Sequence, residues 1–323
     1  MCIGAQKSGT TWLYENLRTH PALWLPPEKE LHYFGERAEV RHPLLELVKR
    51  SSSGRLWLDQ LRRHVREWRT DPSLSALRWY ARFFLASPSE SWYLSLFEAG
   101  EELVTGEITP AYATLNHAQI AEVRRILPHV KLIFLMRNPI ERGWSHARMQ
   151  MHHGFLDNHP ADIRNHLRSE ESIVRTDYVR TLDCWRTFYS PEDIFVGFIE
   201  DIHFRPEEFL GRLCAFLGVD RNVDWPYLHQ RVYTRSALSI PILWASELAE
   251  LHRDLIHELS KRFGGWAEWW QFCRDSLVDC PSGEDPAFPL YESSLWQVWS
   301  KGTVPPIQSN KLDHAAARVG VAP

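Results

Sequence analysis

A loop that combines glycines, a lysine and hydroxyl side chains follows a short apolar segment at the start of the chain: Gly4-Ala5-Gln6-Lys7-Ser8-Gly9-Thr10-Thr11-Trp12. Glycine lets the backbone turn tightly and approach an anion closely. The residues after the loop predict a helix from Trp12 to about His20, which Pro21 ends, and the amides at a helix N-terminus favour phosphate. Lys7 adds a mobile cation. An ordinary glycine turn with a surface lysine is the alternative, but the clustering favours a strand–loop–helix phosphate site.

A second phosphate-binding device is predicted near the middle of the chain. Residues 131–136 form the clearest buried-strand pattern, which ends on Arg137, and Ser145 follows eight residues later. One loop holds one phosphate group, so two devices indicate a nucleotide that is phosphorylated at two places. The alternative is an arginine paired with a surface carboxylate and a serine without a role.

These motifs differ from those of ATP-binding proteins that use a Walker loop. In the Walker pattern G-x-x-x-x-G-K-[ST] the lysine follows the second glycine, whereas Lys7 precedes Gly9. A Walker protein also needs a strand that ends in aspartate to help hold magnesium, and the candidate strand ends in Arg137. A P-loop nucleotide kinase is therefore the less favoured alternative.

Apolar strands alternate with helices along the chain. Residues 194–199 predict another buried strand, and residues 139–152 predict a helix with Glu141 and Arg142 on its solvated face. This alternation predicts an α/β fold of three layers, in which a central parallel sheet is flanked by helices, of the P-loop nucleotide-binding type.

Composition limits the remaining possibilities. The 323 residues, 44% hydrophobic and 24% charged, fit one globular domain over residues 1–323, with a core at 1–270 and a wrapping tail at 271–323. A net charge of -4 is too near neutral to imply nucleic-acid binding. No apolar stretch approaches the length of a membrane span, and no signal peptide is seen, so a cytoplasmic location is expected unless a segment precedes Met1.

Cysteine and histidine spacing predicts neither a disulfide framework nor a metal site. The five cysteines are scattered, and Cys273 and Cys280 are a candidate pair only in an oxidising compartment. No His/Cys cluster has the spacing of metal ligands.

The two phosphate motifs resemble those of sulfotransferases that use 3'-phosphoadenosine 5'-phosphosulfate (PAPS). The resemblance covers roughly residues 2–270 and implies PAPS as sulfuryl donor, adenosine 3',5'-bisphosphate (PAP) as product and no required metal. It implies that Arg137 and Ser145 grip the 3'-phosphate, and that Trp12 stacks near the adenine unless it is a core residue. Arg235 and Ser236 are weaker candidates for a loop over the 3'-phosphate. The nucleotide-binding residues implied in the first motif are Gln6, Lys7, Ser8, Gly9, Thr10, Thr11 and Trp12.

The candidate base lies in the segment Lys29-Glu30-Leu31-His32-Tyr33-Phe34. This segment resembles the Glu-x-His-Phe-Phe segment of glycosaminoglycan sulfotransferases, in which the glutamate is catalytic, and that position is Glu30 here. Small-molecule sulfotransferases use a histidine, so His32 is the second choice. The alternative is a surface glutamate and a core histidine.

A further segment, Gly106-Glu107-Ile108-Thr109-Pro110-Ala111-Tyr112, resembles the Glu-Lys-Thr/Ser-Pro-x-Tyr segment of the same enzymes. Ile108 stands where those enzymes have a lysine, so a highly sulfated polysaccharide acceptor is in doubt. Glu107 either orients Lys7, binds acceptor or forms a structural ion pair.

The sequence therefore predicts an enzyme that transfers a sulfuryl group from PAPS to a hydroxyl or amine of a carbohydrate or small molecule. A P-loop nucleotide kinase and a catalytically silent protein that binds nucleotide or glycan are the alternatives. Acceptor specificity is expected from residues 36–100 and 150–175, where no motif is interpretable. The oligomeric state is left open.

Overall fold

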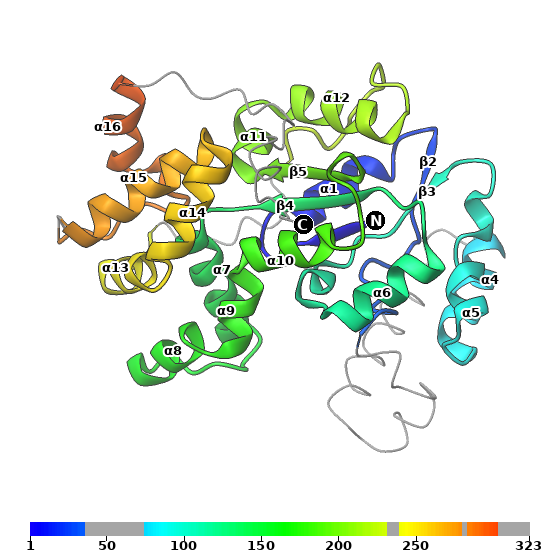
Figure 1. Ribbon diagram of the computed structural model, residues 1–323, viewed down its shortest axis with the longest axis horizontal. Helices are drawn as coiled ribbons and strands as arrows, with labels where there is room; N and C mark the ends of the chain where they lie inside the picture. Colours follow the sequence, from blue (N-terminus) through cyan, green and yellow to red (C-terminus); the bar gives the residue numbers. More distant parts are fainter. Residues whose placement is uncertain (36–73, 231–238, 280–282, 303–323) are drawn as a thin grey trace, which may run out of the picture.

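The computed structural model describes residues 1–35, 74–230, 239–279 and 283–302 (Figure 1). Its centre is a parallel sheet of three strands in the order β1-β4-β5: β1 (Cys2–Gly4), β4 (Leu132–Met136) and β5 (Ile194–Phe198). Ile133 of β4 is aligned with Cys2 on one side and with Phe195 on the other. All three strands are buried throughout their length, as expected for parallel strands covered on both faces.

Helices cover both faces of the sheet, so the predicted three-layer architecture is confirmed. Leu132, Phe134 and Met136 of β4 belong to one buried cluster, which includes side chains of α6 (His117–Ile126), α7 (Pro139–His152) and α10 (Tyr178–Arg186). Ile133 and Leu135 belong to a second cluster, with side chains of α1 (Thr10–Leu17) and α12 (Pro206–Leu217). Successive residues of β4 belong to different clusters because the side chains of a strand point alternately to its two faces.

A small parallel pair, β2 (Leu23–Trp24) and β3 (Val104–Thr105), lies beside the main sheet. A parallel bridge between Cys2 and Ile108 continues the main sheet on the outer side of β1. The remaining elements are α4 (Leu74–Leu85), α5 (Glu90–Ser95), η2 (Glu98–Gly100), η3 (Pro110–Thr114), α8 (Pro160–Leu167), α9 (Glu170–Thr176), η4 (Pro191–Asp193), α11 (Ile199–Phe204), α13 (Ile242–Leu251), α14 (Arg253–Phe263), α15 (Trp266–Asp279), η5 (Leu290–Glu292) and α16 (Ser294–Gly302).

The C-terminal helices gather at the end of the molecule away from β2 and β3 (Figure 1). Helix α15 runs through residue 270, where the sequence analysis divides core from tail, and α16 packs on it through aromatic rings. The ring centroids of Trp269 and Trp296 are 5.2 Å apart, and those of Trp269 and Trp299 are 5.4 Å apart. Burial of these large rings holds the residues before position 303 on the body of the protein.

Candidate active site

The phosphate loop connects β1 to α1 at the carboxyl end of the parallel sheet. Gly9 has the left-handed conformation, φ 89°, and no side chain of the described residues caps α1. The first amides of the helix therefore keep donors available for an anion. Ser8 and Thr10 are buried at this turn, and Thr11 is half-buried. The buried Oε1 of Gln6 has no hydrogen-bond partner among the described residues.

Gly4, the first glycine of the motif, is required by a close approach of the neighbouring segment. A Cβ atom at this position would lie 2.8 Å from Ala113 Cβ and 3.1 Å from the carbonyl oxygen of Pro110. Element η3 can therefore pack directly on the end of β1 only if residue 4 has no side chain. The sequence analysis assigned this glycine to a tight turn and to close approach of an anion, and did not foresee its contact with η3.

Three of the predicted site residues have left-handed backbone conformations that are costly for residues other than glycine. Their φ angles are 73° for Lys7, 67° for Glu30 and 55° for His32. Each such residue costs on the order of 1–3 kcal/mol, and residues of this kind cluster at functional sites. The sequence gives no signal of this feature, because none of the three is a glycine or an asparagine.

Arg137 lies at the end of β4 and reaches the phosphate loop. Its Nη1 donates to the backbone carbonyl of Lys7 at 3.3 Å, and its Nε donates to Glu141 Oε2 at 2.7 Å. Burial lowers the pKa of Arg137, but the charge and hydrogen bond of Glu141, together with the charges of Tyr291 and Glu200, outweigh that effect and raise the pKa above its usual range. The two predicted phosphate devices are therefore in direct contact.

Glu141 and Arg142 were expected on a solvated helix face, and that prediction is wrong. The two residues are only 1% and 0% exposed. Glu141 accepts the backbone N–H of Leu290 in addition to Arg137, and Arg142 Nη2 donates to the carbonyl oxygen and hydroxyl of Ser172, both at 3.1 Å. Element η5, through Leu290, and helix α9, through Ser172, cover this turn of α7, which a pattern within one helix cannot reveal.

Ser145 is half-buried on α7, on the helix face that it shares with Glu141 and Arg148, since the spacings are four and three residues. The guanidinium groups of Arg137 and Arg148 both lie over the ring of Phe288, at 4.7 Å and 5.8 Å from its centroid. Arg148 thus lies near Arg137, on the helix face that also carries Ser145. Arg148 was missed by the sequence analysis, although its spacing from Ser145 was a usable signal.

Glu30 is tied both to its own segment and to the phosphate loop. Its backbone N–H donates to the carbonyl of Ile108 at 3.0 Å, Lys29 Nζ lies 2.7 Å from Oε1, and His32 Nε2 lies 3.4 Å from Oε2. Lys29 Nζ also reaches Thr10 Oγ1 of α1 at 3.4 Å. Burial raises the pKa of Glu30, but the hydrogen bond to His32 and the charge of Lys29 lower it to about 2.

Glu107 is the centre of a buried cluster of hydroxyl groups. It accepts the Tyr93 hydroxyl at 2.6 Å, the Thr109 hydroxyl at 2.7 Å and the Tyr112 hydroxyl at 3.3 Å. Burial raises the pKa of its carboxyl group. Ile108, the residue in the lysine position of the resembling segment, is 2% exposed and packs in the apolar layer behind β1. These contacts favour a structural role for Glu107 through its hydroxyl donors.

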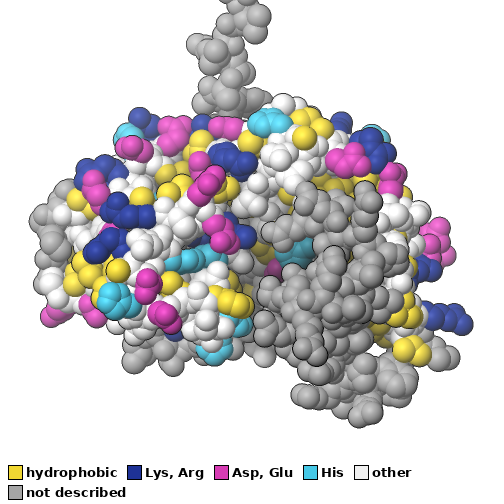
Figure 2. Space-filling model, turned by 90° about the horizontal axis from the view of Figure 1, so that it is seen from below, with side chains coloured by type: hydrophobic (Ala, Val, Ile, Leu, Met, Phe, Trp, Pro, Cys, Tyr) yellow, Lys and Arg dark blue, Asp and Glu magenta, His cyan; other side chains and the backbone are white. Residues whose placement is uncertain are grey.

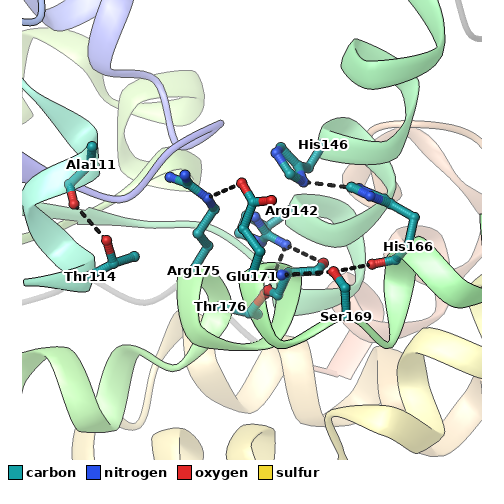
Figure 3. A network of polar contacts seen from close by, with 10 residues as sticks. Ala111, Thr114, Arg142, His146, His166, Ser169, Glu171, Arg175 and Thr176 are labelled. Atoms are coloured by element: carbon teal, nitrogen blue, oxygen red, sulfur yellow. Dashed lines mark hydrogen bonds and ion pairs between the residues drawn. The ribbon is translucent and has the colours of Figure 1, made fainter. Parts of the chain in front are cut away.

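A polar network lies beside the loop on α7, α8 and α9 (Figure 3). His146 and His166 point toward each other, with 3.2 Å between Nδ1 and Nε2, while Arg175 Nε donates to Glu171 at 3.0 Å. Burial, followed by the charge of Arg142, lowers the pKa of His146 to about 2, and the charge of Lys7 also acts on this ring. The sequence analysis missed this network, whose signal is the four-residue spacing of Arg142 and His146.

Trp12 is 7% exposed and packs with α12. Its ring lies edge-on to Phe209, with centroids 6.0 Å apart, and Nε1 donates to the carbonyl of Leu228 at 3.0 Å. This placement agrees with the core-residue alternative, and an adenine contact stays a prediction. Arg235, Ser236 and Cys280 lie outside the described residues.

The donor groups at the two devices suit a nucleotide that carries two phosphate groups. One device holds Lys7 and the first amides of α1, which no described side chain caps, and the other holds Arg137, Ser145 and Arg148. Within the described residues, no group of His, Cys, Asp and Glu side chains is arranged to hold a metal ion, and no helix is long and apolar enough to cross a membrane. Figure 2 shows basic and acidic side chains interspersed over the face viewed from below.

Comparison with solved structures finds sulfotransferases, and one of them shares the fold. A sulfotransferase from Alicyclobacillus acidocaldarius is 20% identical, covers 80% of this chain and 93% of its own, and superposes with a TM-score of 0.53. The sulfotransferase domain of the Synechococcus PCC 7002 olefin synthase is 22% identical over 78% of this chain and 93% of its own, with a TM-score of 0.47. The sulfotransferase domain from the curacin biosynthetic pathway is 20% identical over 70% of this chain and 75% of its own, with a TM-score of 0.44.

A search of curated protein sequences finds no match to this chain. The sequence profile of the Sulfotransferase family matches residues 1–223, which include both phosphate devices and the Glu30 segment. The match thus spans more than half of the chain and all three strands of the central sheet. The chain belongs to the sulfotransferase family.

Proposed function

We propose that this protein transfers a sulfuryl group from PAPS to a hydroxyl or amine of a carbohydrate or small-molecule acceptor. One observation carries the proposal: Arg137 of the second phosphate device contacts the backbone of Lys7 in the first, at 3.3 Å. Two anion-binding devices in contact suit one nucleotide with phosphate groups on both the 5' and 3' sides. The adenosine part of PAPS carries this arrangement, and ATP does not.

In the proposed reaction, Glu30 takes the proton of the acceptor as the acceptor oxygen or nitrogen forms a bond to sulfur. The bond between sulfur and the bridging phosphate oxygen breaks, and its electron pair stays on the phosphate of PAP. Lys7 and the first amides of α1 stabilise the charge that grows on that oxygen. The protein contributes positioning and electrostatic stabilisation, with no step that requires a metal.

Arg137 and Ser145 are proposed to read the 3'-phosphate, and Arg148 adds a second cation on the same helix face. Glu30 is preferred to His32 as the base, because Glu30 is the residue connected to Thr10 of the phosphate loop, through Lys29. Because the pKa of Glu30 is about 2, its carboxyl group is ionised at neutral pH.

The acceptor is proposed to be a carbohydrate or a small molecule that is not highly anionic. Ile108 is packed in the core, so this position contributes no cation to an acceptor. Near the loop, Arg175 is already paired with Glu171 at 3.0 Å. A strongly sulfated polysaccharide would need more unpaired cations than these two positions provide.

Isothermal titration calorimetry with PAP and with Mg-ATP tests the donor assignment. We expect PAP to bind at least about tenfold more tightly, because ATP lacks the 3'-phosphate that Arg137 would contact through charge-assisted hydrogen bonds. A preference for Mg-ATP would instead favour the nucleotide kinase alternative. Tight binding of PAP without turnover of PAPS, over a panel of alcohols, phenols, amines and oligosaccharides, would favour the silent binding protein.

A further inference from the structure

Lys29 joins the candidate base to the phosphate loop. Its ammonium group lies 2.7 Å from Glu30 Oε1 and 3.4 Å from Thr10 Oγ1, and its side chain is 18% exposed. The side chain of Lys29 contacts both the first residue of α1 and the Glu30 carboxylate. Lys29 thus places a cation between the Glu30 carboxylate, which is the proposed base, and the phosphate loop, which is proposed to hold PAPS.

The electrostatics of this position are unfavourable without an anion. Thr10 is the first residue of α1, and the N-terminus of a helix carries a partial positive charge that repels a cation. Arg137, on the other side of the same loop, is neutralised by its ion pair with Glu141. Glu30 is the carboxylate in contact with Lys29, and its negative charge offsets the repulsion between Lys29 and the helix N-terminus.

We propose that Lys29 is a cation shared between the base and the donor, pairing with Glu30 in the free protein and contacting the sulfuryl oxygens when PAPS is bound. This inference rests on the proposed function. The flexible four-carbon stem of a lysine allows such a change of partner without movement of the backbone. Lys29 then acts as a positioning residue for Glu30 and as a contact for the transferred group.

Donor binding would thereby activate the base. The titratable groups that act on Glu30 are Lys29 and His32 on its own segment, and the thiol of Cys2 on β1 senses the charges of both Lys29 and Glu30. A pKa of about 2 makes Glu30 a weak base, because general bases work best with a pKa near the working pH. Transfer of the Lys29 contact to the sulfuryl group removes one of the interactions that lower this pKa.

Calorimetry with PAPS and PAP separates this role from a structural one, because only PAPS carries the sulfuryl group. We expect Lys29→Met to weaken PAPS binding at least about tenfold, as for a lost charge-assisted contact, and PAP binding less than twofold. Lys29→Arg should restore most of the PAPS affinity. Lys261→Met is the matched control, since Lys261 is exposed in the last turn of α14, and it should change neither affinity.

The outcomes of this experiment are distinguishable. Equal weakening of PAPS and PAP by Lys29→Met, or no weakening of either, overturns the shared-cation proposal and leaves the proposed function standing. Failure of the wild-type protein to bind either ligand overturns both. Far-ultraviolet circular dichroism and thermal unfolding check the fold of Lys29→Met. If that variant does not fold, the PAPS and PAP affinities of Lys29→Arg, which keeps the charge, are compared with those of the wild-type protein.

Discussion

The buried pair of Arg137 and Glu141 permits a quantitative prediction for Glu141→Gln. The two side chains are 9% and 1% exposed, and Nε and Oε2 are 2.7 Å apart. Glutamine keeps the volume of glutamate, and its amide oxygen can still accept the N–H of Leu290. The substitution therefore removes mainly the negative charge that neutralises Arg137.

Breaking a buried ion pair typically costs about 3–5 kcal/mol, since a charge is left without compensation. Glu200 lowers this cost. Burial and then the charge of Glu141 raise the pKa of Glu200 to about 8, so Glu200 is largely protonated at neutral pH. Without the charge of Glu141 the pKa of Glu200 falls, and the charge of Glu200 acts on Arg137. We therefore expect Glu141→Gln to lower the free energy of unfolding by about 3 kcal/mol, at the lower end of that range.

Urea unfolding at pH 7, with and without saturating PAP, measures this effect. The 3'-phosphate of PAP would supply the missing negative charge, so PAP should stabilise Glu141→Gln more than it stabilises the wild-type protein. Glu122→Gln is the matched control: Glu122 also lies 2.7 Å from an arginine, Arg125, but both side chains are about half exposed, and such pairs contribute about 0–1 kcal/mol. Two results would refute the reasoning. One is an equal loss of unfolding free energy in Glu141→Gln and Glu122→Gln, and the other is an equal stabilisation of Glu141→Gln and the wild-type protein by PAP.

Three further predictions concern the base, the loop cation and Glu200. Glu30→Gln should lower turnover by about a hundredfold or more with PAP affinity unchanged; an active Glu30→Gln beside an inactive His32→Ala would assign the base to His32. Lys7→Ala should lower the single-turnover rate at saturating PAPS, because it removes roughly 3–4 kcal/mol of transition-state stabilisation. An unchanged saturated rate with weaker PAPS binding would show that Lys7 only binds the donor. Between its ordinary pKa and about 8, Glu200 binds more protons in the folded state than in the unfolded state, so its contribution to stability falls as the pH rises through this range. Glu200→Gln should reduce the pH dependence of the urea-unfolding free energy across this range. An unchanged pH dependence would contradict this prediction.

The strands, and the strand–loop–helix that carries the first motif, were predictable because their signals are local. Residues 132–136 form an apolar run between Lys131 and Arg137, and such a run is buried where it lies in a parallel sheet covered on both faces. Helix 139–152 begins at a proline and was predicted with its observed bounds. The three-layer fold then follows from alternating strands and helices.

The errors arise where distant segments meet. Glu141 is buried because Leu290, far along the chain, donates to it, and no helix pattern reports such a contact. Residues 150–175 held no interpretable motif, yet α8 and most of α9 form there, and His166 of α8 contacts His146. The left-handed conformations of Lys7, Glu30 and His32 also depend on the packing around the loop rather than on residue type.

Transfer of labelled sulfur from PAPS tests the central claim most directly. The wild-type protein, in the presence of a metal chelator, is incubated with sulfur-labelled PAPS and a panel of hydroxyl- and amine-bearing acceptors. Our account predicts label on at least one acceptor, with PAP formed in equal amount, and loss of both products in Glu30→Gln. Absence of labelled product with every acceptor, or transfer by Glu30→Gln at the wild-type rate, would contradict it.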